Sequence, residues 1–250
     1  DIIQTHALMS LPLAYKEMHT PSSETMLAAA KRRFAFEELF VVMAAAEQMR
    51  QMSKRAQAHP IVFDERIAKQ FVAELPFAMT DDQRAASWKI LQDMQSDDPM
   101  NRLLEGDVGS GKTLVAAMAS LMALENGMQV AFIAPTEILA KQHYATLKKI
   151  LSYTKHSKDI ALLVGSLKKS EKQKLKDSIA RKQATLLVGT HALLEEDIDW
   201  HTLGLVIIDE QHRFGVKQRQ KLQTKTNFMP HVLCMTATPI PRSLALTVYG

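Results

Sequence analysis

The sequence "LVIIDEQHRFG" at residues 205–215 is the most informative about the fold, because four aliphatic residues lead directly into two carboxylates. An uninterrupted aliphatic run of this kind is typical of a strand buried on both faces, as in parallel sheets that helices cover on both sides. Asp209 and Glu210 therefore follow a central strand, at the sheet edge where α/β proteins bind their ligands.

Similar apolar runs occur from about residue 77 onward, with helical patterns between most of them. The six runs are NRLLE (101–105), QVAFIA (129–134), IALLVG (160–165), ATLLVG (184–189), LGLVIID (203–209) and HVLCMTA (231–237). The clearest helical patterns cover residues 112–125 and 137–151. This alternation predicts an α/β fold of three layers, with a mostly parallel central sheet.

The first 75 residues have a different texture: they contain no glycine and favour helices. A long helix is expected with Glu24 in its first turn, and a second one between Asp64 and Pro76. We therefore expect a helical segment over residues 1–75 and an α/β domain over residues 76–250.

The chain is mildly basic, with a net charge of +4, which permits a polyanionic partner. Residues 148–182 hold eleven basic residues against three acidic ones, and could form either a solvated helix face or a surface for phosphates. The single cysteine, Cys234, lies in an apolar run and is expected to be buried. Neither zinc-ligand spacing nor a membrane-length apolar run is present.

The sequence "GDVGSGKT" at residues 106–113 fits the phosphate-loop pattern G-x-x-x-x-G-K-[ST] in full. Its glycines allow backbone N–H groups to surround a phosphate chain, while Lys112 supplies a positive charge and Thr113 a hydroxyl ligand for Mg²⁺. The residues expected to bind the nucleotide here are Gly106, Gly109, Ser110, Gly111, Lys112 and Thr113.

The acids after the central strand complete such a site. Asp209 is expected to hold Mg²⁺ through water, and Glu210 to act as the base that orients or activates the attacking water. The alternative is that both acids are ordinary solvated loop residues, which the nearby phosphate loop makes much less favourable.

Two other segments hold polar residues that could cap helices. Thr80 and Gln83 have the spacing of a helix capping box. Thr236 and Thr238 follow the last apolar run, where their hydroxyls could sense bound phosphate or cap the next helix.

Taken together, these segments resemble superfamily 2 helicase motors, whose first domain is a RecA-like P-loop NTPase fold. Phe77 and Gln83 match the adenine-contacting positions of the Q motif. The other matches are motif I (106–113), Ia (134–143), Ib (188–194), II (209–212) and III (236–238).

The resemblance extends to the RecG family of branched-DNA translocases, through "MNRLLEGDVGSGKT", "IIDEQHRFGVKQR" and "MTATPIPRSLALTVYG". Transcription-repair coupling translocases share "TPIPR" and "RFGV" but usually have "DEEQ" where this chain has "DEQH" at residues 209–212, which favours the RecG family. The similarity is strong over residues 76–250 and weaker over residues 20–60.

This resemblance implies a role for each matching position. Glu210 is the catalytic base, and Gln211, His212, Thr236, Ala237 and Thr238 couple hydrolysis to movement. DNA backbone contacts fall to Thr136, Gly165, Ser166, Gly189 and Thr190. The implied cofactors are ATP and Mg²⁺. The implied partner is branched double-stranded DNA, bound without sequence specificity by a monomer in the bacterial cytoplasm, at the nucleoid.

The chain starts at Asp1, and we expect it to be a piece of a longer protein. The resemblance implies that the helical segment 1–75 consists of the tail of a preceding wedge domain, at residues 1–20, and of helices that link it to the motor. It also implies a second RecA-like domain with an arginine finger after Gly250. Residues 1–250 alone should then bind nucleotide weakly and hydrolyse almost none. A small-molecule kinase would have no use for the helicase-like motifs. A non-catalytic binding module would not need Lys112, Asp209 and Glu210.

Overall fold

The structure is a computed structural model that describes residues 2–54, 57–181, 183, 185–190, 193, 198–210 and 228–237. The chain divides after residue 53 into two compact units, a helical one and one built around a sheet. Each unit is described by itself below.

The helical unit contains α1 (Ile2–Thr5), α2 (Leu11–His19) and the long α3 (Glu24–Lys54). Helix α2 packs on α3 through Tyr15 and Phe34, whose ring centroids lie 5.0 Å apart. The turn between them is fixed by the Glu17 carboxylate, which accepts hydrogen bonds from the Ser22 N–H (2.7 Å) and hydroxyl (2.8 Å). The long helix expected from Glu24 onward is confirmed.

The second unit is built on a sheet of six parallel strands in the order β1-β6-β5-β2-β4-β3. The strands are β1 (Asn101–Glu105), β2 (Gln129–Ile133), β3 (Ile160–Leu163), β4 (Leu186–Gly189), β5 (Leu203–Asp209) and β6 (His231–Thr236). Strands β2, β4 and β6 are buried along their whole length, which explains their uninterrupted apolar sequences. The predicted α/β class with a parallel sheet is confirmed.

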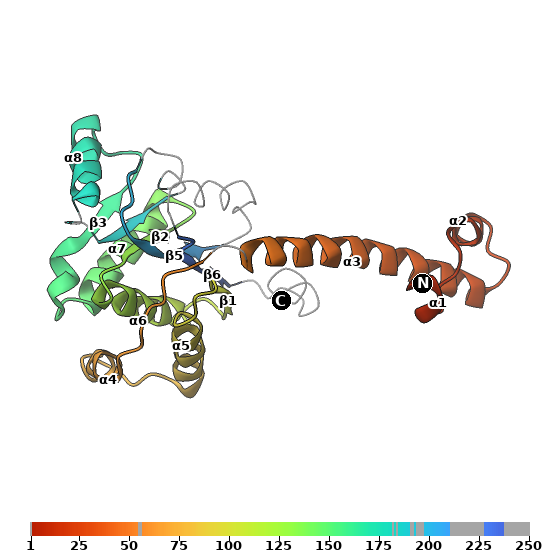
Figure 1. The fold of residues 1–250 in the computed structure, drawn as a ribbon, viewed down its shortest axis with the longest axis horizontal. Coiled ribbons are helices and arrows are strands. Elements are labelled where there is room, and N and C mark those ends of the chain that lie inside the picture. The colour runs from red at the N-terminus through yellow and green to blue at the C-terminus, as the bar shows by residue number, and fades with distance from the viewer. Residues whose placement is uncertain are drawn as a thin grey trace. The chain divides into compact units, whose positions relative to one another are not determined.

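Helices cover both faces of the sheet. They are α4 (Glu65–Ala73), α5 (Asp81–Asp93), α6 (Lys112–Glu125), α7 (Glu137–Ile150) and α8 (Lys169–Ala180), with a 3₁₀ turn η1 (Lys155–Asp159). Crossovers between parallel strands are right-handed as a rule, so the strand order places α6 and α7 on one face of the sheet. After β3 the chain moves back across the sheet to β4, so α8 lies on the other face (Figure 1). Helix α6 is buried on all sides, since α4 and α5 cover its outer surface.

A buried histidine holds together the amino-terminal ends of the strands. His231 Nδ1 accepts a hydrogen bond from the Met100 N–H, and Nε2 donates to the His59 carbonyl, each at 3.0 Å. Burial lowers the pKa of His231 below its usual value, so the ring stays neutral with its single proton on Nε2. The segment before α4 is thereby tied to the sheet.

Two other expectations concern the sheet unit. Cys234 is fully buried, as predicted. Helix α4 packs on α6 in the same unit as the sheet, while the proposed domain boundary at residues 75/76 stays a prediction. Within the described ranges, no helix is both long and apolar enough to span a bilayer.

Candidate active site

The phosphate loop joins β1 to α6 and depends on two glycines in the left-handed region of backbone space. Gly109 has a φ of 85° and Gly111, which caps α6, a φ of 83°. Residues that carry a Cβ rarely adopt this backbone conformation, which is why glycine occupies both positions. The loop thus brings the N-terminal N–H groups of α6 to the carboxyl edge of the sheet, where they suit a phosphate.

The Lys112 side chain folds back onto the phosphate loop. Its ammonium group donates hydrogen bonds to the carbonyl oxygens of Gly106 and, at 2.9 Å, of Asp107. Thr113 follows in the first turn of α6 and is partly exposed. The loop therefore offers backbone N–H groups, an ammonium and a hydroxyl within a few residues.

Gln83 connects the helix before the sheet to the phosphate loop. Its Oε1 accepts from the Thr80 N–H (3.0 Å), and the Thr80 hydroxyl accepts from the Gln83 N–H (3.2 Å), so the predicted capping box of α5 is present. The same amide uses Nε2 to donate to the Ser110 carbonyl at 2.8 Å. The Gln83 amide thus serves helix and loop together. Phe77, the other predicted adenine contact, is 55% exposed.

The acids at the end of β5 take different conformations. Asp209 is the last residue of the strand. Glu210 has a φ of 54°, a left-handed conformation that is uncommon for residues other than glycine and frequent at functional sites. The turn aims the Glu210 carboxylate at the end of β6, where Oε1 accepts a hydrogen bond from the Ala237 N–H at 3.3 Å.

The end of β6 links the phosphate loop to the acids. Strand β6 lies between β1 and β5, so about 10 Å separates the strands that carry the two halves of the site. The Thr236 carbonyl accepts from the Gly106 N–H at 3.3 Å, while the next N–H, of Ala237, donates to Glu210. The two described residues of motif III therefore join motifs I and II. Thr238, Gln211 and His212 lie outside the described residues.

One side chain at the site was not singled out from the sequence. His143 on α7 places Nε2 2.8 Å from Oδ2 of Asp209, and both side chains are only 13% exposed. Its ring packs on Phe132 of β2, with ring centroids 4.6 Å apart. A lone histidine in a helical sequence gives no sign of such a contact, which depends on β2 and β5 being neighbours.

The predicted DNA-contacting residues gather at the same edge of the sheet, on the other half of it. Thr136 follows β2 and caps α7, Gly165 and Ser166 follow β3, and Gly189 ends β4 with Thr190 next to it. Strands β2, β4 and β3 are adjacent in the sheet. Residues from three separate stretches of sequence therefore lie together at the carboxyl ends of adjacent strands, where α/β sheets bind their ligands.

Glu137 organises part of this group. Its Oε1 accepts a hydrogen bond from the Ser166 N–H at 3.0 Å, so the first turn of α7 holds the loop after β3. Hydrogen bonding from Ser166 keeps the pKa of the Glu137 carboxyl below its usual value, and burial opposes this shift. The carboxylate is therefore ionised at neutral pH, next to the positive end of α7.

The lysines of the basic stretch named here are all exposed, but two of them have partners within the chain. Lys155 pairs with Glu125 at 2.7 Å, and Lys148 lies over the ring of Tyr144. Lys168 and Lys169, next to the loop after β3, are exposed. The sequence left open whether this stretch is solvated or faces phosphates. The structure leaves two of its lysines accessible beside Ser166.

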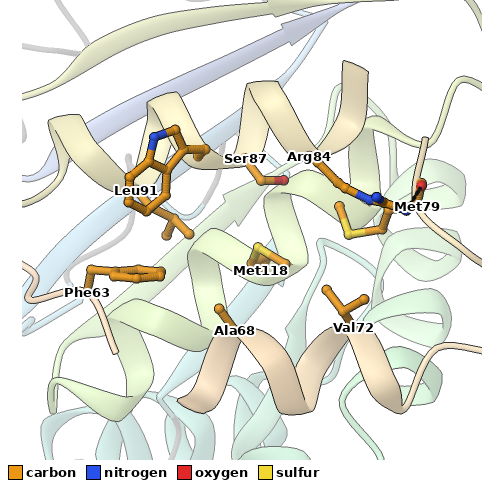
Figure 2. Close-up of a pocket in the computed structure, with 9 residues that line it drawn as sticks. Phe63, Ala68, Val72, Met79, Arg84, Ser87, Leu91 and Met118 are labelled. Atoms are coloured by element: carbon orange, nitrogen blue, oxygen red, sulfur yellow. Dashed lines mark hydrogen bonds between the residues drawn. The ribbon is translucent and has the colours of Figure 1, made fainter. Parts of the chain in front are cut away.

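A small groove of about 120 Å³ lies between α4, α5 and α6 (Figure 2). Phe63, Val72, Met79 and Leu91 are among its lining residues, with the buried Ser87 facing in from α5. The lining is mainly apolar, and its one charged residue, Arg84, donates a hydrogen bond to the Met79 carbonyl at 2.9 Å. We interpret the groove as incomplete packing of α4 and not as part of the strand-end site.

The fold and this site define a RecA-like P-loop NTPase domain. Residues 80–247 match the family described as DEAD/DEAH box helicase, and the chain belongs to that family. Members of this family use ATP, which identifies the nucleotide expected at the phosphate loop.

Similarity to curated relatives covers the whole chain. It is 46% identical over 249 residues to the ATP-dependent DNA helicase RecG of Thermotoga maritima, covering 100% of this chain and 32% of that protein. For RecG of Synechocystis sp. the identity is 44% over 252 residues, covering 100% and 30%. The chain thus spans about a third of the length of the curated relatives it matches.

Solved structures agree. A structure of RecG bound to a three-way DNA junction matches with a TM-score of 0.86 and 42% identity, covering 100% of this chain and 33% of that one. The UvsW helicase of bacteriophage T4 matches with a TM-score of 0.55 at 17% identity, over 78% of this chain and 66% of that one, and supports the fold alone. The resemblance to RecG drawn from the motifs is confirmed.

Proposed function

We propose that this chain is the ATP-binding half of a motor that moves along double-stranded DNA and remodels branched DNA. In support, its relatives are named ATP-dependent DNA helicase RecG, and a solved structure of RecG is bound to a three-way DNA junction. One observation carries the proposal: motif III joins the phosphate loop to Glu210, next to a second strand-end cluster suited to DNA. A motor requires both a nucleotide site and a DNA site on one rigid sheet, whereas a small-molecule kinase does not require a DNA site.

In this proposal the loop residues bind the phosphates of ATP, and Lys112 neutralises the outer ones. Thr113 and Asp209 hold Mg²⁺, a hard cation that takes a hydroxyl, a carboxylate, phosphate oxygens and water. This donor set fits magnesium, which would neutralise the charge that develops on the phosphates. Glu210 orients the attacking water and accepts its proton. Gln83 and Phe77 contact the adenine.

The cluster on β2, β4 and β3 would contact the DNA backbone. Thr136, Ser166 and Thr190 offer hydroxyl and N–H donors, which suit phosphate oxygens and carry no sequence information. Recognition would therefore depend on the shape of the DNA. We further propose that the protein acts as a monomer, at the bacterial nucleoid where its substrate lies. Gln211, His212 and Thr238 would complete the coupling machinery.

The test compares two substitutions in the full-length protein. Lys112→Ala should abolish both nucleotide binding and hydrolysis, since the loop loses its charge. Glu210→Gln should reduce hydrolysis by about two to four orders of magnitude and still bind ATP, because Asp209 and the loop remain. Hydrolysis by each variant is measured as phosphate release stimulated by a three-way DNA junction. Nucleotide binding is measured separately with a fluorescent ATP analogue. Normal hydrolysis by Glu210→Gln would show that another group is the base. If junction DNA gave no stimulation in the unsubstituted protein, the motor proposal itself would be wrong.

A further inference from the structure

His143 stands at the boundary between the two halves of the sheet edge. The nucleotide residues follow β1, β6 and β5, and the DNA cluster follows β2, β4 and β3. Among the strands that the structure describes, β5 and β2 are the two that meet across this boundary, and their pairing reaches Ile208 and Ile133 at the carboxyl edge. His143 belongs to α7, the helix that follows β2, and its bond to Asp209 crosses the boundary.

The bond is well suited to fix a carboxylate. His143 Nε2 lies 2.8 Å from Oδ2 of Asp209, and neither side chain is more than 13% exposed, so water competes little. The ring is held from behind by Phe132. A carboxylate held through one oxygen keeps a single orientation and leaves Oδ1 for the water shell of a cation. Such outer partners of metal ligands commonly set their orientation.

The same helix reaches into the DNA cluster. Thr136 caps α7, and Glu137 in its first turn holds the Ser166 N–H. His143 lies seven residues after Thr136, which is about 10 Å along a stiff helix. A small displacement of the start of α7 therefore moves the imidazole that holds Asp209.

We propose that His143 is a positioning residue that connects the DNA-contacting start of α7 to the magnesium-binding acid. It orients Asp209 for the cation, and through α7 it makes that orientation depend on bound DNA. This inference rests on the proposed function. It goes further by assigning to one histidine the physical link between the two sites.

The experiment uses the full-length protein with His143→Leu, which removes the donor, and His143→Gln, whose amide nitrogen can still donate at similar reach. His201→Gln is the control, because His201 is exposed and precedes the amino-terminal end of β5, at the edge of the sheet opposite both clusters. The first readout is binding of a fluorescent ADP analogue at increasing Mg²⁺. His143→Leu should need about tenfold more Mg²⁺ for half-maximal enhancement, with unchanged binding in EDTA. His143→Gln and His201→Gln should stay close to the unsubstituted protein.

The second readout is stimulation of hydrolysis by a three-way DNA junction at saturating Mg²⁺. For each variant the stimulation is the ratio of the junction-stimulated rate to that variant's own DNA-free rate. This ratio should fall severely in His143→Leu and stay close to that of the unsubstituted protein in His143→Gln. Superimposable Mg²⁺ titrations for His143→Leu and the unsubstituted protein would overturn the proposal. So would equal losses in His143→Leu and His143→Gln, since that result points to packing on Phe132. The Mg²⁺ titration needs no DNA, so it can succeed even if the motor proposal fails.

Discussion

Gly111 is the residue at which the phosphate loop and the capping box of α5 meet. Its φ of 83° is unfavourable for any side chain, and an added Cβ would run into the amide nitrogen of Gln83. That amide also donates to the Ser110 carbonyl. A methyl group at position 111 would therefore disturb the loop from two directions.

We predict that Gly111→Ala lowers nucleotide affinity by at least about tenfold, or about 1.4 kcal/mol. Gly127→Ala is the matched control, because Gly127 has a similar φ of 74° but nothing lies within 4 Å of its added Cβ. Both variants should lose about 1–2 kcal/mol of folding stability from left-handed strain. Urea unfolding and binding of a fluorescent nucleotide check the two effects. Equal losses of affinity in both variants would contradict the prediction.

Among the elements, α7 has the most varied connections at the strand ends. It is capped by Thr136, holds the loop after β3 through Glu137, and reaches Asp209 through His143. The sequence predicted a helix over residues 137–151 and a match to motif Ia over residues 134–143. The structure shows that side chains of this helix contact both groups of strand-end residues.

We predict that Glu137→Ala weakens binding of junction DNA severalfold, because the loop with Gly165 and Ser166 loses its anchor. Glu137→Gln should keep most of the affinity, since its amide oxygen still accepts from the Ser166 N–H. Glu171→Ala is the control: that carboxylate also sits in the first turn of a helix and accepts from the Lys168 N–H. Fluorescence anisotropy of labelled junction DNA measures the affinities. A loss as large in Glu171→Ala would show that helix-end charge alone is responsible.

At the scale of the sheet unit, His231 joins segments that are far apart in sequence. It bonds to Met100 before β1 and to His59 before α4. Its pKa is lowered by burial, so between that value and the ordinary value of about 6.5 the unfolded chain binds more protons than the folded one. The contribution of neutral His231 to folding stability is therefore fully present above pH 6.5 and is lost as the pH falls below that value.

We predict that unfolding in urea at pH 5.5 needs less denaturant than at pH 7.5, and that His231→Gln reduces this difference. The glutamine can keep an acceptor and a donor but does not titrate. His156, whose pKa is also lowered chiefly by burial, contributes in the same direction, so the difference should shrink without vanishing. His201→Gln, at an exposed position, should leave it unchanged. An undiminished pH dependence in His231→Gln would contradict the assignment.

For the whole protein, we predict that residues 1–250 bind nucleotide but show almost no DNA-stimulated hydrolysis. In the helicases that the motifs resemble, a second RecA-like domain supplies an arginine finger, worth about three to five orders of magnitude in rate. Single-turnover hydrolysis by residues 1–250, compared with the full-length protein, measures the difference. Robust stimulated turnover by the shorter chain would contradict this view.

Local signals in the sequence were sufficient to predict several elements. The sequence predicted β1, β5 and α6 with the bounds they have in the structure, because continuous apolar runs, glycines and caps are local signals. It also singled out residues 106–113 as a candidate phosphate loop, because this pattern is specific, and Asp209 and Glu210 as its candidate partners at a strand end.

How these parts are joined depends on the order of the strands in the sheet. The position of β6 between β1 and β5 makes motif III the link between the phosphate loop and Glu210, and the β2–β5 pair brings His143 to Asp209. The bond from Gln83 to Ser110 likewise joins residues 27 positions apart. The physical reason is that strand order and cross-strand contacts arise from long-range packing of similar apolar strands, which local periodicity does not encode.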